Sequence, residues 1–127
     1  MQAEIEATEI DATVLAGVDA HRAGQTDIAQ KLYSTVLKFN PNHPHANHNL
    51  GLISKSQGKL TQAISLYEAA INQVPHSLQF WKSYIDLLVD LNRLEEVSDA
   101  WSVATTSAVS HQILEYVTDS LYKATYF

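Results

Sequence analysis

Histidine is the residue type in this chain whose spacing could support metal binding or acid–base chemistry. His43, His45 and His48 lie close together in the 127-residue sequence, and His76 follows in a similar turn. Two imidazoles three residues apart on one helix can face a single metal ion. A closed zinc site needs about four ligands, however, and neither cysteine nor carboxylate lies near these histidines in the sequence. We therefore expect no metal site here, and interpret the cluster as a polar turn followed by the exposed start of a helix.

The other patterns that could carry catalysis are weak. Asp86 and Asp90 are four residues apart, so on a helix both carboxylates lie on one face. An acid–base pair is conceivable there, but a solvated or ligand-facing stripe explains the spacing as well. The sequence contains neither a GxSxG nucleophile motif nor a phosphate-binding glycine–lysine motif. We expect a protein that is not an enzyme, with no catalytic residues and no cofactor.

Composition narrows the class of protein further. The net charge is −6, with only 8 Lys and Arg residues, whereas nucleic-acid binders carry a basic patch that displaces counterions from phosphates. The absence of cysteine excludes disulfides and thiol chemistry. The first residues show neither the basic region nor the apolar stretch of a signal peptide, and no segment approaches the roughly 20 apolar residues that span a bilayer. These features predict a cytoplasmic protein that binds neither nucleic acid nor membranes.

An internal repeat of 34 positions predicts the elements that hold these residues. The matching rows are Ala29, Ala63 and Val97; Tyr33, Tyr67 and Trp101; Gly24, Gly58 and Asn92; Pro41 and Pro75; and Gly17 and Gly51. The glycine–asparagine row suits a turn that needs a left-handed residue. The alanine row suits a close approach of two helices, and the aromatic row fills the space around the second helix of each unit. The prolines end that helix.

Apolar residues recur at helical intervals throughout, and no segment has the alternation of a strand. We predict helices at about 8–23, 27–40, 44–57, 61–74, 78–91, 95–107 and 110–124. The repeats then cover about 10–43, 44–77 and 78–108, within a single domain of residues 1–127. A last helix, at about 109–125, keeps helical spacing without continuing the repeat, which is typical of a helix that caps a stack.

From about Ile10 to Thr106 the chain resembles the tetratricopeptide repeat family. The best copy supplies the family positions Leu50, Gly51, Gly58, Ala63, Tyr67 and Pro75. Ile85, Val97 and Val109 depart from the family pattern, replacing a glycine, an alanine and a proline. The resemblance implies an all-α, right-handed solenoid of three helix pairs with a C-terminal capping helix, and an altered helix angle in the third pair.

The resemblance also implies a concave groove lined by the first helix of each pair, in which a protein or peptide partner lies. The groove residues carried over are Val18, Arg22, His45, His48, Asn49, Leu52, Lys55, Lys82 and Asp86. Arg22, Lys55 and Lys82 are three of the 8 cationic residues, so this face could receive a carboxylate or an acidic segment. A family variant that clamps C-terminal carboxylates is not expected, because only Asn49 matches its residues.

The leading expectation is therefore a protein-interaction scaffold, and two alternatives stay open. Residues Gln79–Arg93 resemble a segment of bacterial repeat arrays, some of which precede a transferase domain, so the chain could present substrates within a longer bacterial protein. Met1 and Phe127 instead suit a free-standing chain. The second alternative is self-association through the C-terminal helix, whose aromatic residues exceed what a one-sided cap needs. They are Tyr116, Tyr122, Tyr126 and Phe127.

Overall fold

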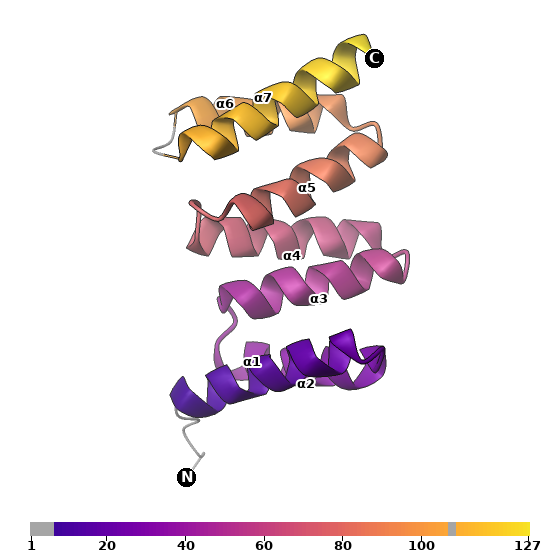
Figure 1. The fold of residues 1–127 in the computed structure, drawn as a ribbon, viewed down its shortest axis with the longest axis vertical. Coiled ribbons are helices and arrows are strands. Elements are labelled where there is room, and N and C mark those ends of the chain that lie inside the picture. Colours follow the sequence, from indigo (N-terminus) through magenta and orange to yellow (C-terminus); the bar gives the residue numbers. More distant parts are fainter. Residues whose placement is uncertain (1–6, 107–108) are drawn as a thin grey trace. The chain divides into compact units, whose positions relative to one another are not determined.

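The computed structural model describes residues 7–106 and 109–127, and within these residues the chain forms seven helices and no strand (Figure 1). The helices are α1 (Ala7–Arg22), α2 (Thr26–Phe39), α3 (Pro44–Ser56), α4 (Leu60–Gln73), α5 (Leu78–Asp90), α6 (Leu94–Thr106) and α7 (His111–Tyr126). Each lies within two residues of its predicted limits. The all-α helical-repeat fold is thus confirmed. The predicted domain and third repeat also include residues 1–6 and 107–108, which lie outside the described residues.

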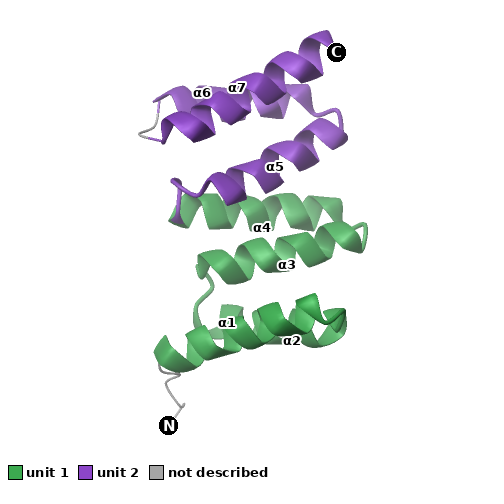
Figure 2. Ribbon diagram, viewed as in Figure 1, with its two compact units in different colours: residues 1–73 green, residues 74–127 purple. Residues whose placement is uncertain are grey.

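The chain divides into two compact units, and each is described by itself (Figure 2). Unit 1 covers residues 1–73 and unit 2 covers residues 74–127. In unit 1, α1 packs on α2 and α3 packs on both α2 and α4. In unit 2, α7 packs on both α5 and α6. The first helices of the predicted pairs therefore belong to different units: α1 and α3 lie in unit 1, and α5 lies in unit 2.

The turns inside the helix pairs have the predicted left-handed residues. Gly24 and Gly58 have φ angles of 79° and 77°, and Asn92 has a φ angle of 55°. Asparagine is one of the few side chains that tolerates this region. The third pair therefore keeps the same tight turn without glycine.

Two glycines inside first helices explain where the tyrosine row sits. A Cβ atom on Gly17 would lie 2.6 Å from Cε1 of Tyr33, and one on Gly51 would lie 2.6 Å from Cε1 of Tyr67. These distances are far below ordinary contact, so only glycine lets each ring lie flat on the first helix of its own pair. Both tyrosines are consequently buried.

In the third pair, Trp101 takes the position of Tyr33 and Tyr67 but is not buried as they are, so the prediction for Trp101 was wrong. Ile85 takes the glycine position and is itself fully buried, so the helix surface on which the ring lies in the first two pairs carries a bulky side chain here. Trp101 is 37% exposed and does not fill the core as expected. Its indole Nε1 instead donates to Oγ1 of Thr118 on α7, at 3.0 Å. The irregular third pair is thus joined to α7.

Three of the helices begin with the same capping arrangement. The side chains of His43, Ser77 and Ser110 each accept a hydrogen bond from the backbone N–H three residues later, which satisfies one of the free donors of the first turn. The residues that donate are Ala46, Phe80 and Ile113, and all three are buried. α7 therefore begins with the same cap as α3 and α5. Its cap, Ser110, lies 33 positions after Ser77, one fewer than the repeat length of 34.

A second hydrogen bond recurs at the starts of α3 and α5. In each helix a side chain donates to the carbonyl of the proline that precedes the helix. Nδ2 of Asn47 donates to the carbonyl of Pro41 at 3.1 Å, and Nε1 of Trp81 donates to the carbonyl of Pro75 at 2.9 Å. The two donors are 34 positions apart, as are the two prolines. Both donors are buried, so each hydrogen bond holds the proline turn against the start of the helix that follows it.

Candidate functional site

The groove residues of unit 1 come from α1 and α3 and differ in exposure. Side chains that project to the surface are Arg22, His45 and Lys55. Val18, Asn49 and Leu52 are half-buried among them. His48 is the exception, because it is only 1% exposed. Unit 1 therefore offers a face of mixed charged and apolar character, without His48.

The side chain of Tyr33, on α2, interacts with one residue of each of these two helices. Tyr33 hydrogen-bonds with Asn49 of α3 and lies within the electrostatic reach of Arg22 of α1. Burial raises the pKa of Tyr33 above its ordinary value, and the Asn49 hydrogen bond and the Arg22 charge only partly offset this rise. The hydroxyl thus remains protonated and fixes Asn49 beneath the surface that Arg22 borders.

His48 packs in the core of unit 1 and is not available to a partner on the surface. Its ring lies 5.6 Å from the ring of Tyr67, and its Nδ1 is 3.3 Å from Oδ1 of Asn49. Burial lowers the pKa of His48, which the Asn49 hydrogen bond partly opposes and the charge of His45 reinforces. The groove position of His48 is therefore corrected to a packing position.

Because His48 is buried, we expect the free energy of unfolding to fall at acidic pH. Because its pKa in the folded chain lies below the unfolded value of about 6.5, the unfolded chain binds a proton that the folded chain excludes. Stability is then complete above that pH and falls as the pH drops through it. Burial lowers the pKa of His43 too, so it adds a loss of the same sign.

Urea unfolding between neutral pH and pH about 5 measures this loss around the histidine pKa. A His48→Phe variant should lose less stability over that range than the parent chain. His111→Phe is the matched control, because it removes an imidazole whose side chain is 89% exposed. Equal slopes for the parent and His48→Phe would contradict the prediction.

In unit 2, the two predicted groove residues both contact Tyr116 of α7. The Tyr116 hydroxyl donates a hydrogen bond to Oδ1 of Asp86, and Nζ of Lys82 lies 5.3 Å from the centre of the Tyr116 ring. Burial raises the pKa of Tyr116 to about 12, and the neighbouring Asp86 carboxylate adds to the rise. The hydroxyl therefore stays a donor at neutral pH, and the three side chains form one cluster.

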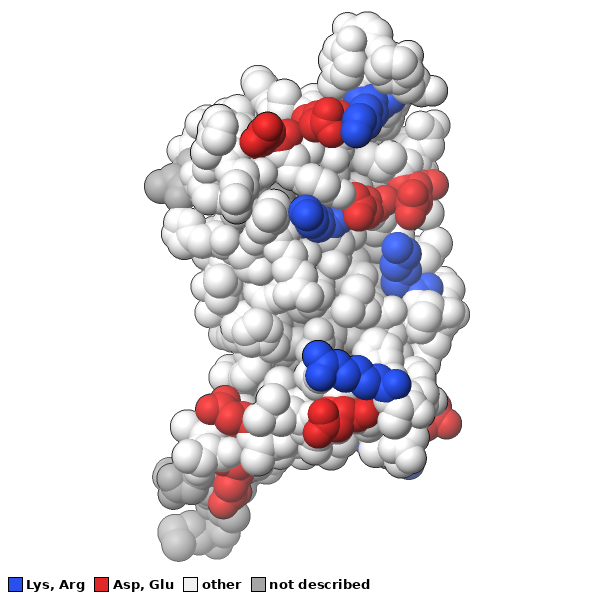
Figure 3. All heavy atoms as spheres, viewed as in Figure 1, with Lys and Arg blue, Asp and Glu red and all other residues white. Residues whose placement is uncertain are grey.

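That cluster borders a shallow pocket of about 500 Å³ between α5 and α7. The pocket is lined by Leu78, Lys82, Gln112, Glu115, Tyr116 and Asp119. Unit 2 is acidic, since residues 74–127 contain three Lys or Arg and seven Asp or Glu, against five and seven in residues 1–73. On the face seen in Figure 3, basic and acidic side chains of the described residues are interspersed, and neither sign forms a large patch.

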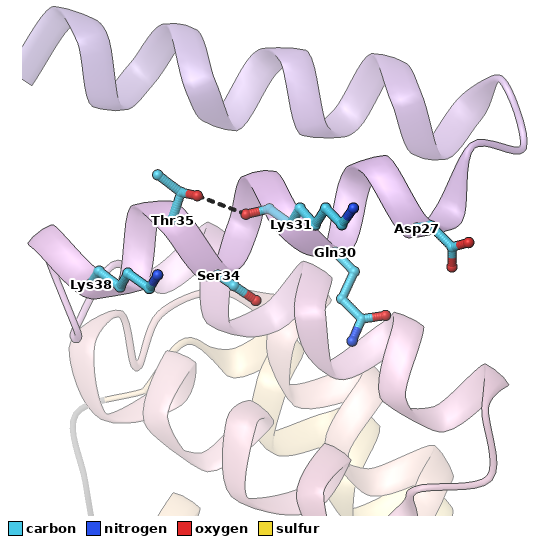
Figure 4. Close-up of a pocket in the computed structure, with 6 residues that line it drawn as sticks. All are labelled: Asp27, Gln30, Lys31, Ser34, Thr35 and Lys38. Carbon is cyan, nitrogen blue, oxygen red and sulfur yellow. Dashed lines mark hydrogen bonds between the residues drawn. The ribbon is translucent and has the colours of Figure 1, made fainter.

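A second shallow pocket lies along α2 alone. Figure 4 shows its polar side chains spread along this one helix, with the Thr35 hydroxyl donating to the carbonyl of Lys31. Its lining residues are Asp27, Gln30, Lys31, Ser34, Thr35 and Lys38. Because one helix supplies all of them, the pocket lacks the converging groups of a ligand site. Its lysines, Lys31 and Lys38, lie on the surface outside the predicted groove.

The described residues hold neither a group of metal-binding side chains nor a helix suited to a membrane. No group of three or more His, Cys, Asp or Glu side chains lies within reach of one metal ion there. The rings of His43 and His45 are 6.3 Å apart and tilted. In the same residues, no helix combines the length and apolar character that crossing a membrane requires.

The repeat pattern and the helix pairs agree with a known family. The sequence profile of the tetratricopeptide repeat matches residues 14–77, which is half of the chain. The chain belongs to the tetratricopeptide repeat family. No curated protein sequence matches it.

Solved structures of the same family resemble the whole chain in fold. The first repeat domain of Spaghetti (RPAP3) bound to the HSP90 peptide SRMEEVD is 16% identical, with a TM-score of 0.74 over 98% of this chain and 96% of that one. PcrH from Pseudomonas aeruginosa is 16% identical, with a TM-score of 0.70 over 95% of each chain. The Sgt2 repeat domain from Aspergillus fumigatus is 18% identical, with a TM-score of 0.70 over 98% and 87%.

Sequence reasoning missed two residues of this tetratricopeptide face. Tyr33 was assigned to the core, yet its hydroxyl holds Asn49. Tyr116 was assigned to a surface for self-association, yet it contacts Lys82 and Asp86 of α5. The signal for Tyr116 was available, because aligning the cap at Ser110 with the cap at His43 puts Tyr116 in the position of Asn49.

Proposed function

We propose that this chain is a non-catalytic scaffold that binds a peptide or protein segment on the face formed by α1 and α3, the first helices in unit 1. The observation that carries the proposal is the hydrogen bond between Tyr33 and the half-buried Asn49 of α3, at a place where the exposed Arg22 of α1 acts on the same tyrosine through its charge. An amide held beneath a surface cation suits an extended chain, whose carbonyls and carboxylates need donors. The fold neighbour that holds an HSP90 peptide supports this kind of ligand.

The segment that suits unit 1 is acidic. Arg22 and Lys55 project from its two first helices, and Val18 and Leu52 lie half-buried between polar neighbours as apolar contact surface. Unit 2 suits an acidic segment less well, because Lys82 shares its pocket with Glu115 and Asp119. We therefore assign the acidic part of the partner to α1 and α3.

Charge reversal tests this assignment. Lys55→Glu should weaken the binding of acidic peptides about tenfold and reduce its salt dependence, since a surface attraction becomes a repulsion. Lys82→Glu should have a smaller effect, because Lys82 already lies over the Tyr116 ring. Lys31→Glu, on α2, is the matched control and should bind as the parent does.

Fluorescence polarisation with labelled synthetic peptides measures these affinities. The probes are acidic, basic and apolar peptides of equal length, together with SRMEEVD, the peptide bound by the neighbouring structure. The acidic class should bind best, and SRMEEVD should bind no better than a scrambled version, because Val18 stands where the carboxylate clamp needs a polar residue. Equal weakening by Lys31→Glu and Lys55→Glu would exclude the proposed face.

A further inference from the structure

The C-terminal half of α7 carries aromatic rings that are exposed to solvent. Tyr122, Tyr126 and Phe127 are 55%, 71% and 95% exposed. The ring of Tyr122 lies 5.0 Å from that of Tyr126 and 6.0 Å from that of Phe127, so the three rings form one cluster. A cluster of large apolar side chains on the surface, in contact mainly with one another, marks an interface more often than a solvated face.

The rings belong to a face of α7 that is divided by charge. Glu115, Asp119, Tyr122 and Tyr126 recur at spacings of four, three and four, so they lie along one face of the helix. The first half of this face is acidic and the second half is aromatic. Lys123, which pairs with Asp119 at 2.9 Å, borders the aromatic half.

The aromatic half of this face lies opposite the packed side of α7. Ile113 and Val117 are fully buried on the opposite side of α7, where the helix packs on α5 and α6. In unit 1, by contrast, α3 is packed by α2 on one side and α4 on the other. Among the described residues of unit 2, α5 borders the acidic half of this face across the pocket that holds Lys82, Glu115 and Asp119. No helix described in unit 2 covers the aromatic half, whose rings are exposed.

We propose that a second copy of this chain covers this face, with the two α7 helices packed antiparallel. In that arrangement the aromatic half of each helix lies on the acidic half of the other, and the Lys123 ammonium faces the partner's carboxylates. A two-fold contact needs such a self-complementary surface, because each residue pair occurs twice. The hydrogen bond from Tyr116 to Asp86 shows the same chemistry, a tyrosine hydroxyl on a carboxylate of a neighbouring helix.

The size of the face sets the strength of the dimer. α7 has 16 residues and is therefore about 24 Å long, at 1.5 Å per residue. One helix pair of this length belongs to the small interfaces, below about 1,200 Å², that are weak. The dimer is consequently micromolar and exchanges with monomer. This inference does not depend on peptide binding by α1 and α3.

Sedimentation equilibrium of the whole chain tests the dimer, at chain concentrations up to about 1 mM, well above the Kd that such an interface allows. The parent chain should form dimers, and Tyr126→Asp should raise the dimer Kd at least tenfold. Leu15→Asp removes an equally exposed apolar side chain from α1, which is 64% exposed, and should leave the Kd unchanged. A monomeric parent chain overturns the proposal, as does an equal loss in Leu15→Asp.

Mixing two variants tests the antiparallel arrangement. Lys123→Glu and Glu115→Lys should each weaken self-association, because each places like charges opposite one another. An equimolar mixture of the two should associate more tightly than either variant alone, since one copy then offers acids to the bases of the other. Circular dichroism of each variant checks that α7 still folds. A mixture that associates no better than the single variants overturns the antiparallel pairing.

Discussion

A Gly51→Ile variant should lose about 3 kcal/mol of unfolding free energy, because the new side chain enters space that the Tyr67 ring occupies. Even a Cβ atom at Gly51 would lie 2.6 and 2.7 Å from two ring atoms of Tyr67, so the ring must leave its site. The helix propensity of isoleucine exceeds that of glycine by only about 0.5 kcal/mol, which is too little to offset the clash. The fully buried Ile85 beside the exposed Trp101 shows what the displaced arrangement looks like.

Urea unfolding followed by circular dichroism gives this free energy. Ala16→Ile is the control, because Ala16 lies on an exposed side of α1 and the change should stay within about 0.5 kcal/mol. Near-ultraviolet absorption of Tyr67 should also shift as its ring becomes exposed. A Gly51→Ile chain as stable as the Ala16→Ile chain would show that the ring is not confined as described.

Replacing either of two tyrosines at equivalent positions by phenylalanine should change the stability of the chain in opposite directions. Tyr33 and Tyr67 are both buried, but only the Tyr33 hydroxyl has a partner, Asn49. The Tyr67 hydroxyl has no hydrogen-bond partner among the described residues, and burial raises the pKa of Tyr67 to about 12. A buried hydroxyl without a partner destabilises the fold by about 1–2 kcal/mol, the cost of removing it from water.

Tyr67→Phe should therefore stabilise the chain by about 1 kcal/mol, whereas Tyr33→Phe should destabilise it by about 1 kcal/mol. The two variants remove the same atom from equivalent sites, so each serves as the control for the other. Thermal and urea unfolding of the two variants beside the parent chain measure the difference. Destabilisation of equal size in both would mean that the Tyr67 hydroxyl finds a partner in solution.

The helix pairs could be predicted from the sequence because each signal in the repeat has a local cause. Gly24 and Gly58 mark left-handed turns whatever surrounds them, and Pro41 ends a helix by its own covalent geometry. Trp101 was predicted less well because its place depends on a residue 16 positions earlier. The substitution at Ile85 was visible, but sequence alone does not reveal that it turns the indole towards α7.

The candidate site was harder to predict, for a reason visible in α3. This helix is packed on two sides, by α2 and by α4, and so buries Asn47, His48 and Ser54 as well as its apolar residues. From sequence alone, a polar residue on a helix is predicted to be exposed unless the helices packed on both sides of it are known. The assignment of His48 to the groove failed on that ground. Arg22 and Lys55 project to the surface as expected, whereas the roles of the groove residues stay predictions.

The hydrogen bonds from Asn47 to Pro41 and from Trp81 to Pro75 have a consequence for how such chains lengthen. Each of these turns is held by one side chain at the start of a helix, which reaches back to the carbonyl of a proline six residues earlier. Asparagine and tryptophan, which differ greatly in size, both make this hydrogen bond. A duplicated stretch of 34 residues would therefore carry its own connector, and the gene could gain a unit in one step without compensating changes elsewhere.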